Sequence, residues 1–246
     1  MKLKEVVLLG INFLSLPNLN AIIDLNIRNN KEKVIMSWQK LVEQLIIQGI
    51  LKSPHIIRAF SRIDRADFMP KNLKHLAATD HAFPIGFGQT ISQPTTVAFM
   101  LELLQPEKNQ KVLDIGSGSG WTTALLAELV GEKGKVYALE IIPQILEFGR
   151  DNVRKLNLTN VEFSLANGSI GWIKKAPFDR ILCSASAPKI PLALKKQLTP
   201  FGRLVLPVGD MTQSLILIKR AQNLHFTETR YPGFVFVHLR GKHGFR

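Results

Sequence analysis

Apolar residues between positions 37 and 104 recur three or four places apart, which is the period of helices with one buried face. The first such stripe consists of Leu41, Val42, Leu45 and Ile46. Ser37 can cap the start of this helix, and Gly49 can end it. A second helix is expected after Ser53, with Pro54 at its first position and an apolar stripe formed by Ile56, Ile57, Phe60 and Ile63. A third helix is expected over about 93–104, after a loop over 83–92 that contains two glycines.

From residue 111 the pattern changes to short apolar runs that alternate with helical stretches. The predicted strands are 111–115, 135–140, 161–165, 180–184 and 203–208, and the predicted helices are 121–130, 143–156 and 190–198. Such alternation is typical of parallel strands with helices on both faces. Two further strands, 214–219 and 234–239, have no helix between them and are expected to form an antiparallel edge. The pattern predicts an α/β fold: an open, doubly wound, mostly parallel seven-stranded sheet with a small N-terminal helical cap.

The chain divides into three parts on this interpretation. Residues 1–35 contain six asparagines and no sustained period, so they form an atypical N-terminal extension that need not belong to the fold. Residues 36–80 form the helical cap, and residues 81–246 form the sheet domain. Met36 directly precedes the first clear helix, so we hypothesise that translation can start there.

Composition excludes several classes of protein. With 46 % hydrophobic and 21 % charged residues, the 246-residue chain is neither disordered nor fibrous. Cys183 is the only cysteine, which excludes an intrachain disulfide and a thiolate metal cage, and its apolar surroundings predict a buried side chain. The histidines show no ligand spacing, and no apolar run reaches the ~20 residues needed to cross a bilayer. We therefore expect no metal, no membrane contact and a cytoplasmic location.

The net charge of +13 favours polyanions or acidic substrates through long-range attraction. No block of five or six like charges is present, however, so an ordinary solvated surface is the favoured explanation of the charge.

A glycine-rich segment at the end of the first predicted strand carries the clearest ligand signal. It reads Asp114-Ile-Gly116-Ser-Gly118-Ser-Gly120 and opens a helix, where unpaired N–H groups and a partial positive charge are available. Glu140 ends the second strand twenty residues later, where a carboxylate can accept hydrogen bonds from both hydroxyls of a ribose. The spacing differs from the dinucleotide pattern G-x-G-x-x-G. An acid at Asp114 would repel a pyrophosphate but suits the ammonium group of S-adenosylmethionine, so the pattern favours this methyl donor.

A second candidate contact follows the third strand, at Asn167-Gly168. Loops at the carboxyl ends of such strands border the ligand crevice, and the Asn167 amide can bind an adenine. An Asn-Gly pair is equally well explained as a turn former. The predicted donor-binding residues are Asp114, Gly116, Ser117, Gly118, Gly120, Glu140, Asn167 and Gly168.

Three segments together resemble the protein-L-isoaspartate (D-aspartate) O-methyltransferase family. The most specific is residues 83–94, Phe-Pro-Ile-Gly-Phe-Gly-Gln-Thr-Ile-Ser-Gln-Pro, and the others are 198–209 and 236–245. The resemblance runs from about Met36 to Phe245. It implies the Rossmann-like fold of S-adenosylmethionine-dependent methyltransferases and methyl transfer to the α-carboxylate of L-isoaspartyl residues in damaged proteins or peptides, which is a repair reaction.

The resemblance also assigns roles to residues of the loop. It implies that Ser92 belongs to the catalytic site, where it would orient the substrate carboxylate. By the same resemblance, Ile85, Gly86, Gln89, Thr90 and Ile91 would bind the substrate. Since a carboxylate is ionised at pH 7, no general base is required. Isoaspartyl proteins and peptides are the expected partners, with no stable nucleic-acid partner, and a monomer is expected.

Ser92 has a competing interpretation, because it precedes Gln93-Pro94 at a predicted helix start and a serine there can be an N-cap. Two departures from the family pattern are present: Asn167 stands where an aspartate is common, which predicts weaker donor binding, and Trp121 stands where tyrosine is frequent.

Two other functions fit parts of the sequence. An RNA methyltransferase is compatible with the net charge and with the glycine-rich segment 114–120, here called the donor loop, because such loops are common to many methyltransferases. No basic stripe with interleaved aromatic residues is present, however. A non-catalytic protein that binds damaged protein on the same fold is the other alternative, and the intact donor pattern argues against it.

Overall fold

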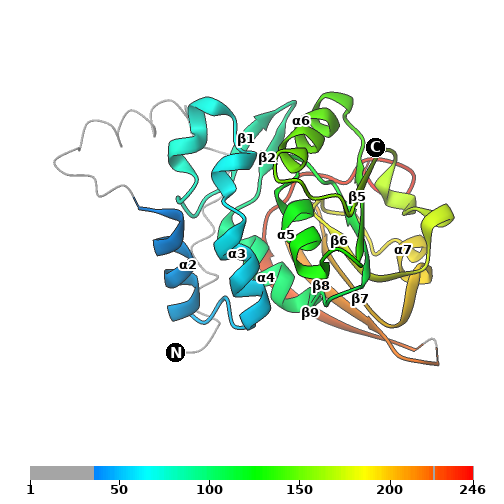
Figure 1. The fold of residues 1–246 in the computed structure, drawn as a ribbon. Helices are drawn as coiled ribbons and strands as arrows, with labels where there is room; N and C mark the ends of the chain where they lie inside the picture. The colour runs from blue at the N-terminus through cyan, green and yellow to red at the C-terminus, as the bar shows by residue number, and fades with distance from the viewer. Residues whose placement is uncertain (1–35, 224, 246) are drawn as a thin grey trace.

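A seven-stranded sheet forms the centre of the computed structural model (Figure 1), which describes residues 36–223 and 225–245. The predicted extension 1–35 and the hypothesis of a start at Met36 concern residues outside this description. The strand order is β5-β4-β3-β6-β7-β8-β9. The strands are β3 (Lys111–Ile115), β4 (Lys135–Glu140), β5 (Val161–Leu165), β6 (Phe178–Cys183), β7 (Leu198–Val208), β8 (Gln213–Arg220) and β9 (Phe226–Phe234).

The pairing of these strands confirms the predicted fold class. β3 to β7 are parallel to one another, and β8 and β9 are added to β7 as the antiparallel edge. The chain runs outward from β3 through β4 to β5 and then returns to the other side of β3 at β6. The order of strands therefore reverses beside β3, and ligands of open α/β sheets bind at the carboxyl ends of the strands at such a point.

Helices cover both faces of the sheet (Figure 1). They are α2 (Trp38–Ile47), α3 (Pro54–Arg62), α4 (Pro94–Leu104), α5 (Trp121–Val130), α6 (Pro143–Arg154) and α7 (Leu192–Lys196), with short 3-10 helices η1 (Arg65–Phe68), η2 (Lys71–Leu76), η3 (Gly168–Ile170) and η4 (Ile173–Lys175). α5 packs on β3 and β4, and α3 packs on α5 from the other side. Nearly every side chain of α5 is therefore buried.

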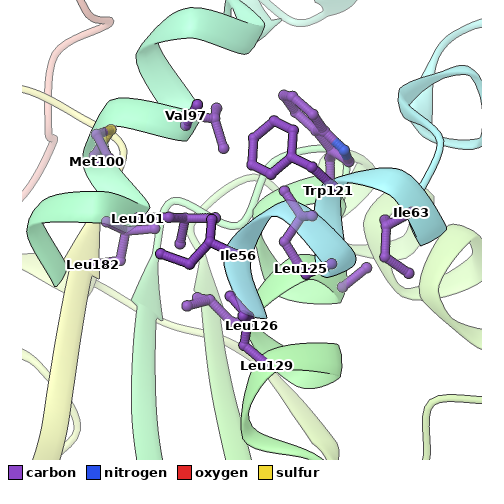
Figure 2. Close-up of a cluster of buried hydrophobic side chains, with 14 of the residues drawn as sticks. Ile56, Ile63, Val97, Met100, Leu101, Trp121, Leu125, Leu126, Leu129 and Leu182 are labelled. Atoms are coloured by element: carbon purple, nitrogen blue, oxygen red, sulfur yellow. The ribbon is translucent and has the colours of Figure 1, made fainter. Parts of the chain in front are cut away.

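The cap helices share one core with the sheet. Figure 2 shows Ile56 of α3 beside Leu101 of α4, with Leu182 of β6 below Leu101, while Ile63, the residue after α3, lies on the side of Leu125 of α5. A stacked Trp38–Phe60 pair, with both rings edge-on to Trp121, extends this core toward α2. Burial of this much apolar surface holds the cap against the start of α5.

The start and end signals of the first two helices are in place, with one change. The Ser37 hydroxyl accepts a hydrogen bond from the backbone N of Lys40, and Gly49 adopts φ +68° after α2. Ser53 is the N-cap of α3 but its side chain makes no capping bond, because its hydroxyl donates to Glu102 instead.

Two predicted elements were wrong. Residues 83–92 are not an irregular loop, since β1 (Phe83–Gly86) and β2 (Gln89–Ile91) pair as a small antiparallel hairpin. The last strand is Phe226–Phe234 rather than 234–239. This edge strand is exposed at most positions and has a polar sequence, so it lacks the apolar run of an internal strand, whereas 235–239 leave the sheet and form only an isolated bridge between His238 and Ser186.

Within the described ranges, no helix combines the length and apolarity required to cross a membrane.

Candidate active site

The glycine-rich segment after β3 forms a loop at the point where the strand order reverses. Gly116, Gly118 and Gly120 adopt φ values of +76°, +54° and +86°, which favour glycine. A Cβ on Gly120 would lie 2.6 Å from the carbonyl oxygen of Gly149 in α6, so glycine is also required by space. The loop ends at Gly120, the N-cap of α5, which has no side chain to cap the helix. The N–H groups at the start of α5 are thus available to a ligand.

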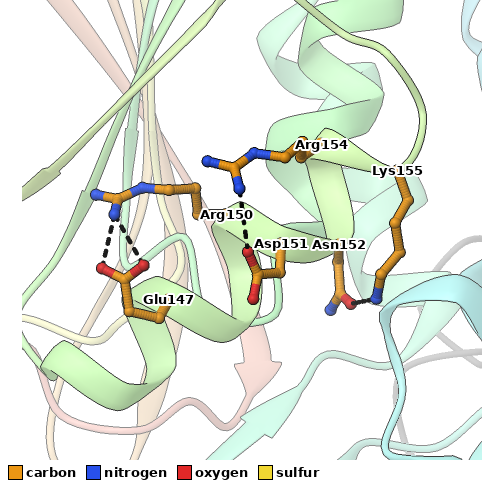
Figure 3. A network of polar contacts seen from close by, with 6 residues as sticks. All are labelled: Glu147, Arg150, Asp151, Asn152, Arg154 and Lys155. Carbon is orange, nitrogen blue, oxygen red and sulfur yellow. Dashed lines mark hydrogen bonds and ion pairs between the residues drawn. The ribbon is translucent and has the colours of Figure 1, made fainter.

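Helix α6 holds this loop from outside. The Nδ2 of Asn152, which is buried, donates to the carbonyl oxygen of Ser119 over 3.1 Å. Its Oδ1 accepts from Lys155, and the exposed pairs Glu147–Arg150 and Asp151–Arg154 lie on the same helix (Figure 3). The sequence pattern gave no sign of Asn152, because its partner is 33 positions away.

Asp114 lies beneath the loop and is fully buried. Its Oδ2 accepts hydrogen bonds from the hydroxyls of Thr123 at 2.6 Å and Thr122 at 3.4 Å. Its Oδ1 has no partner among the described residues, and neither does the buried hydroxyl of Ser117. Buried polar atoms without partners are rare in folded proteins and point to a missing ligand or water. A ligand that carries an ammonium group fits this site.

The ionisation of Asp114 depends on that burial. Burial raises the pKa of Asp114 to about 6, against the hydrogen bonds from Thr123 and Thr122, which lower it, and the charge of Glu140 adds a smaller increase. The carboxyl group is therefore mainly ionised at pH 7, and a cationic ligand would stabilise it further.

Glu140 lies at the carboxyl end of β4 and supports the loop. Its Oε2 accepts from the backbone N of Gly118 at 3.1 Å, and its Oε1 accepts from Ile141 at 2.8 Å and Ile142 at 3.1 Å. A carboxylate has about four acceptor positions, and three are occupied, so this side chain can accept about one further hydrogen bond from a ligand hydroxyl. The contact between Glu140 and a ribose stays a prediction.

Asn167 and Gly168 form the turn that was predicted after the third parallel strand, β5. The Oδ1 of Asn167 accepts from the backbone N of Ser169 at 3.0 Å and from its hydroxyl at 2.7 Å. A Cβ on Gly168 would lie 2.3 Å from Ile115 Cγ2, so this turn packs directly against the end of β3. The turn is thus present and lies beside the donor loop, while a contact between Asn167 and adenine stays a prediction.

The hairpin β1–β2 brings the predicted substrate residues beside the donor loop. A Cβ on Gly118 would lie 3.7 Å from Ile85 Cδ1. Ile85 and Ile91 are buried and anchor the hairpin. The other predicted substrate residues, Gly86, Gln89 and Thr90, are partly or fully exposed near its tip.

Ser92 follows the hairpin immediately and does not have the capping role that was considered for it. The N-cap of α4 is Gln93, one residue later, and the start of α4 is capped by the carboxylate of Asp80. Within the part of the chain that the structure describes, the Ser92 hydroxyl makes no hydrogen bond, and the residue is half-buried.

Two other segments border the site, and the predicted residues did not include them. The end of β6 approaches the donor loop, since a Cβ on Gly116 would lie 3.9 Å from Ala185 Cβ. The closing segment 236–245 crosses the same edge of the sheet, where Leu239 pairs with Ser186 and the backbone N of His243 donates to Ser169. Such contacts join residues more than fifty positions apart and leave no local signal.

Cys183 is buried as predicted, and burial raises the pKa of its thiol to about 12. Among the described residues, no group of three or more His, Cys, Asp or Glu side chains is arranged to hold a metal ion.

Comparison with known proteins shows one consistent similarity. Residues 36–244 match the family model described as Protein-L-isoaspartate(D-aspartate) O-methyltransferase (PCMT). A protein of Methanothrix thermoacetophila named protein-L-isoaspartate O-methyltransferase is 43% identical over 216 residues, which cover 88% of this chain and 97% of the relative. A protein of the same name from Pyrococcus horikoshii is 39% identical over 219 residues, covering 88% and 99%.

Solved structures are similar over the same region. A structure described as protein-L-isoaspartate O-methyltransferase superimposes with a TM-score of 0.75 at 28% identity, covering 85% of this chain and 67% of the other. A Plasmodium falciparum structure described under the same activity, in complex with S-adenosyl-L-homocysteine, gives a TM-score of 0.73 at 24% identity and covers 83% and 99%. At 24% identity, the similarity to this second structure shows a shared fold only.

Proposed function

The chain belongs to the protein-L-isoaspartate(D-aspartate) O-methyltransferase family, and we propose that it transfers a methyl group from S-adenosylmethionine to the α-carboxylate of L-isoaspartyl residues in damaged proteins and peptides. The observation that carries this proposal is the position of the hairpin that precedes Ser92. It lies against Gly118 of the loop whose buried Asp114 has an unpartnered oxygen. Donor and acceptor sites are therefore adjacent.

The residues present fit the methyl donor. Asp114 would pair with the ammonium group through Oδ1, and the start of α5 would face the donor's carboxylate. Glu140 would accept from the ribose hydroxyls, and Asn167 would face the adenine. When bound, the donor supplies a sulfonium-activated methyl group.

The acceptor needs orientation rather than activation. Its carboxylate is ionised at pH 7 and attacks the methyl carbon directly, so an oxygen–carbon bond forms as the carbon–sulfur bond breaks and that electron pair stays on sulfur. No proton is transferred. The Ser92 hydroxyl would donate a hydrogen bond to the other carboxylate oxygen and align the attack, and alignment is the main source of rate in such a reaction.

The comparisons favour this activity over the two alternatives. The curated relatives are named as isoaspartate methyltransferases rather than as enzymes of RNA or as binding proteins. The net charge of +13 alone does not argue for RNA, because charge without a recognised RNA-binding pattern in the sequence gives no specificity for it.

Methyl transfer to two matched peptides tests the proposal. One peptide contains a single L-isoaspartyl residue and its twin contains normal aspartate in the same sequence. We expect label from the donor to enter the isoaspartyl peptide at least a hundredfold faster. Equal labelling, or labelling of neither peptide while RNA is methylated, would contradict the proposal.

Two properties stay predictions: the monomeric state and the cytoplasmic location. Light scattering of the purified protein would test the monomer.

A further inference from the structure

The start of α4, next to Ser92, is capped by a residue from another segment. The Asp80 Oδ1 accepts from the backbone N of Thr95 at 2.8 Å. Its Oδ2 accepts from the Thr95 hydroxyl at 2.7 Å and from Gln93 Nε2 at 3.0 Å. A negative charge at a helix N-terminus is also favoured by the helix dipole. The N-cap residue Gln93 makes no capping hydrogen bond with its side chain, so Asp80 is the side chain that caps α4.

Asp80 accepts from the only backbone N–H that Ser92 could cap, which is that of Thr95. A serine cap accepts from the second or third backbone N–H after it. The second residue after Ser92 is Pro94, which has no N–H, and the third is Thr95. Since Thr95 N already donates to Asp80, the Ser92 hydroxyl is left without a capping partner.

A buried cation fixes the backbone of the same residue. Arg65 of η1 is completely buried, and its Nη2 donates to the carbonyl oxygen of Ser92 at 3.0 Å and to that of His81 at 2.6 Å. Its Nη1 donates to the carbonyl oxygens of Ala77 at 3.2 Å and Thr79 at 3.1 Å. One guanidinium therefore joins the segment that carries Asp80 to the end of the hairpin.

The same guanidinium also contacts both halves of the site. It lies 5.5 Å from the ring centres of Phe83 in β1 and of Trp121 at the start of α5. Burial lowers the pKa of Arg65 to about 9, and the charge of Asp80 acts in the opposite direction, so the group is cationic at neutral pH.

We propose that Asp80 and Arg65 are positioning residues for the acceptor site: Arg65 fixes the backbone of Ser92, and Asp80 replaces Ser92 as the cap of α4. The Ser92 hydroxyl is then free for the acceptor carboxylate. This inference rests on the proposed function, because it concerns the same reaction. Because Asp80 performs the capping, the Ser92 hydroxyl is not required for the structure of α4.

Substitution of Asp80 tests the inference. In Asp80→Ala, Thr95 N–H becomes available and the Ser92 hydroxyl turns to it as a cap. We expect KM for the isoaspartyl peptide to rise at least tenfold, with the Kd for S-adenosylhomocysteine within twofold of wild type. Asp80→Asn keeps one acceptor for Thr95 N–H, so it should rescue most of the loss and leave KM raised about two- to fivefold.

A double variant and a matched control separate positioning from stability. Once Ser92→Ala has removed the hydroxyl, adding Asp80→Ala should change the peptide KM less than twofold. The control is Glu102→Ala, because Glu102 is likewise a carboxylate that holds the segment before a helix, accepting from Lys52 N, Ser53 N and the Ser53 hydroxyl just ahead of α3. It should lower the melting temperature and leave the peptide KM unchanged.

The outcomes are distinct. If wild type does not methylate the isoaspartyl peptide, the proposed function fails. If wild type is active but the Asp80 variants leave the peptide KM unchanged, or if the Asp80 and Ser92 effects are additive, the positioning role is refuted. Should Asp80→Ala not fold, Asp80→Asn decides alone, and an unchanged peptide KM in that variant overturns the inference.

Discussion

Asp114→Asn should stabilise the protein and weaken its binding of the methyl donor. The amide has the same shape as the carboxyl group and can still accept from the Thr123 hydroxyl, which lies 2.6 Å from Oδ2. What it removes is a buried negative charge whose second oxygen has no partner. Stability and binding should therefore change in opposite directions, which is the pattern expected of a residue kept for its ligand.

The size of the stability effect follows from the pKa. Burial raises the pKa of Asp114 from 3.8 to about 6. Ionising it in the folded protein therefore costs about 3 kcal/mol at neutral pH, as an upper value, at 1.36 kcal/mol per pKa unit. Removing this cost should raise the melting temperature of the ligand-free protein by up to about 6–12 °C, at 2–4 °C per kcal/mol for a chain of this size.

The pH dependence has a definite sign. The folded protein holds the Asp114 proton more tightly than the unfolded chain does, so this group adds stability as the pH falls from about 6 toward 4. The advantage of Asp114→Asn should accordingly be complete above pH 6 and should disappear by about pH 4. Thermal melts of both proteins across this range measure it.

Donor binding should show the opposite effect. Loss of a charge-assisted hydrogen bond to the ammonium group costs roughly 1.5–3 kcal/mol, which weakens S-adenosylhomocysteine binding by about 10- to 150-fold. In wild type, the Kd from calorimetry should rise below pH 6 by about tenfold per unit, and in the variant it should not. A variant that melts lower than wild type without ligand, or that binds with the wild-type Kd, would refute the reasoning.

Three other substitutions test separate parts of the site. Ser92→Ala should lower kcat/KM for the isoaspartyl peptide at least tenfold and leave the melting temperature within about 2 °C, because its hydroxyl does not cap α4; a stability loss with normal kcat/KM would restore the capping interpretation. Gly120→Ala places a Cβ 2.6 Å from the Gly149 carbonyl oxygen at φ +86°, so denaturant unfolding should show a loss of roughly 1–3 kcal/mol together with weaker donor binding; unchanged unfolding would show that α6 moves away easily. Asn167→Asp keeps the Oδ1 acceptor for Ser169 and adds a charge to the side chain that is proposed to face the adenine, so calorimetry should show about fivefold tighter S-adenosylhomocysteine binding, at about 1 kcal/mol for a charged acceptor; equal or weaker binding would place the adenine elsewhere.

The inner part of the fold was predictable because its signals are local. The bounds of β3, β4, β5 and α5 agree with the sequence pattern residue for residue, since each is a mainly apolar run that begins after a polar or glycine residue. β9 was misplaced for the opposite reason. An edge strand needs no apolar face, and the buried Leu239 that suggested a strand belongs to the irregular closing segment.

The candidate site was predictable only in part. The spacing of its glycines identifies the donor loop in the sequence, and the positions of Asp114 and Glu140 at strand ends identify these two acids as candidates. The contributions of Arg65, Asp80 and Asn152 depend on partners brought together by the fold, and nothing in their local sequence indicates them. The same limit explains why the capping interpretation of Ser92 stayed open in the sequence, because Asp80, which caps α4, lies twelve residues upstream of Ser92.

The site of methylation on the product tests the central claim most directly. The isoaspartyl peptide and its normal twin are incubated with the protein and S-adenosylmethionine, quenched in acid to preserve esters, and sequenced by tandem mass spectrometry. The account predicts one methyl ester, located on the isoaspartyl residue, and an unmodified twin. A methyl group elsewhere on the peptide, or equal methylation of both peptides, would contradict it.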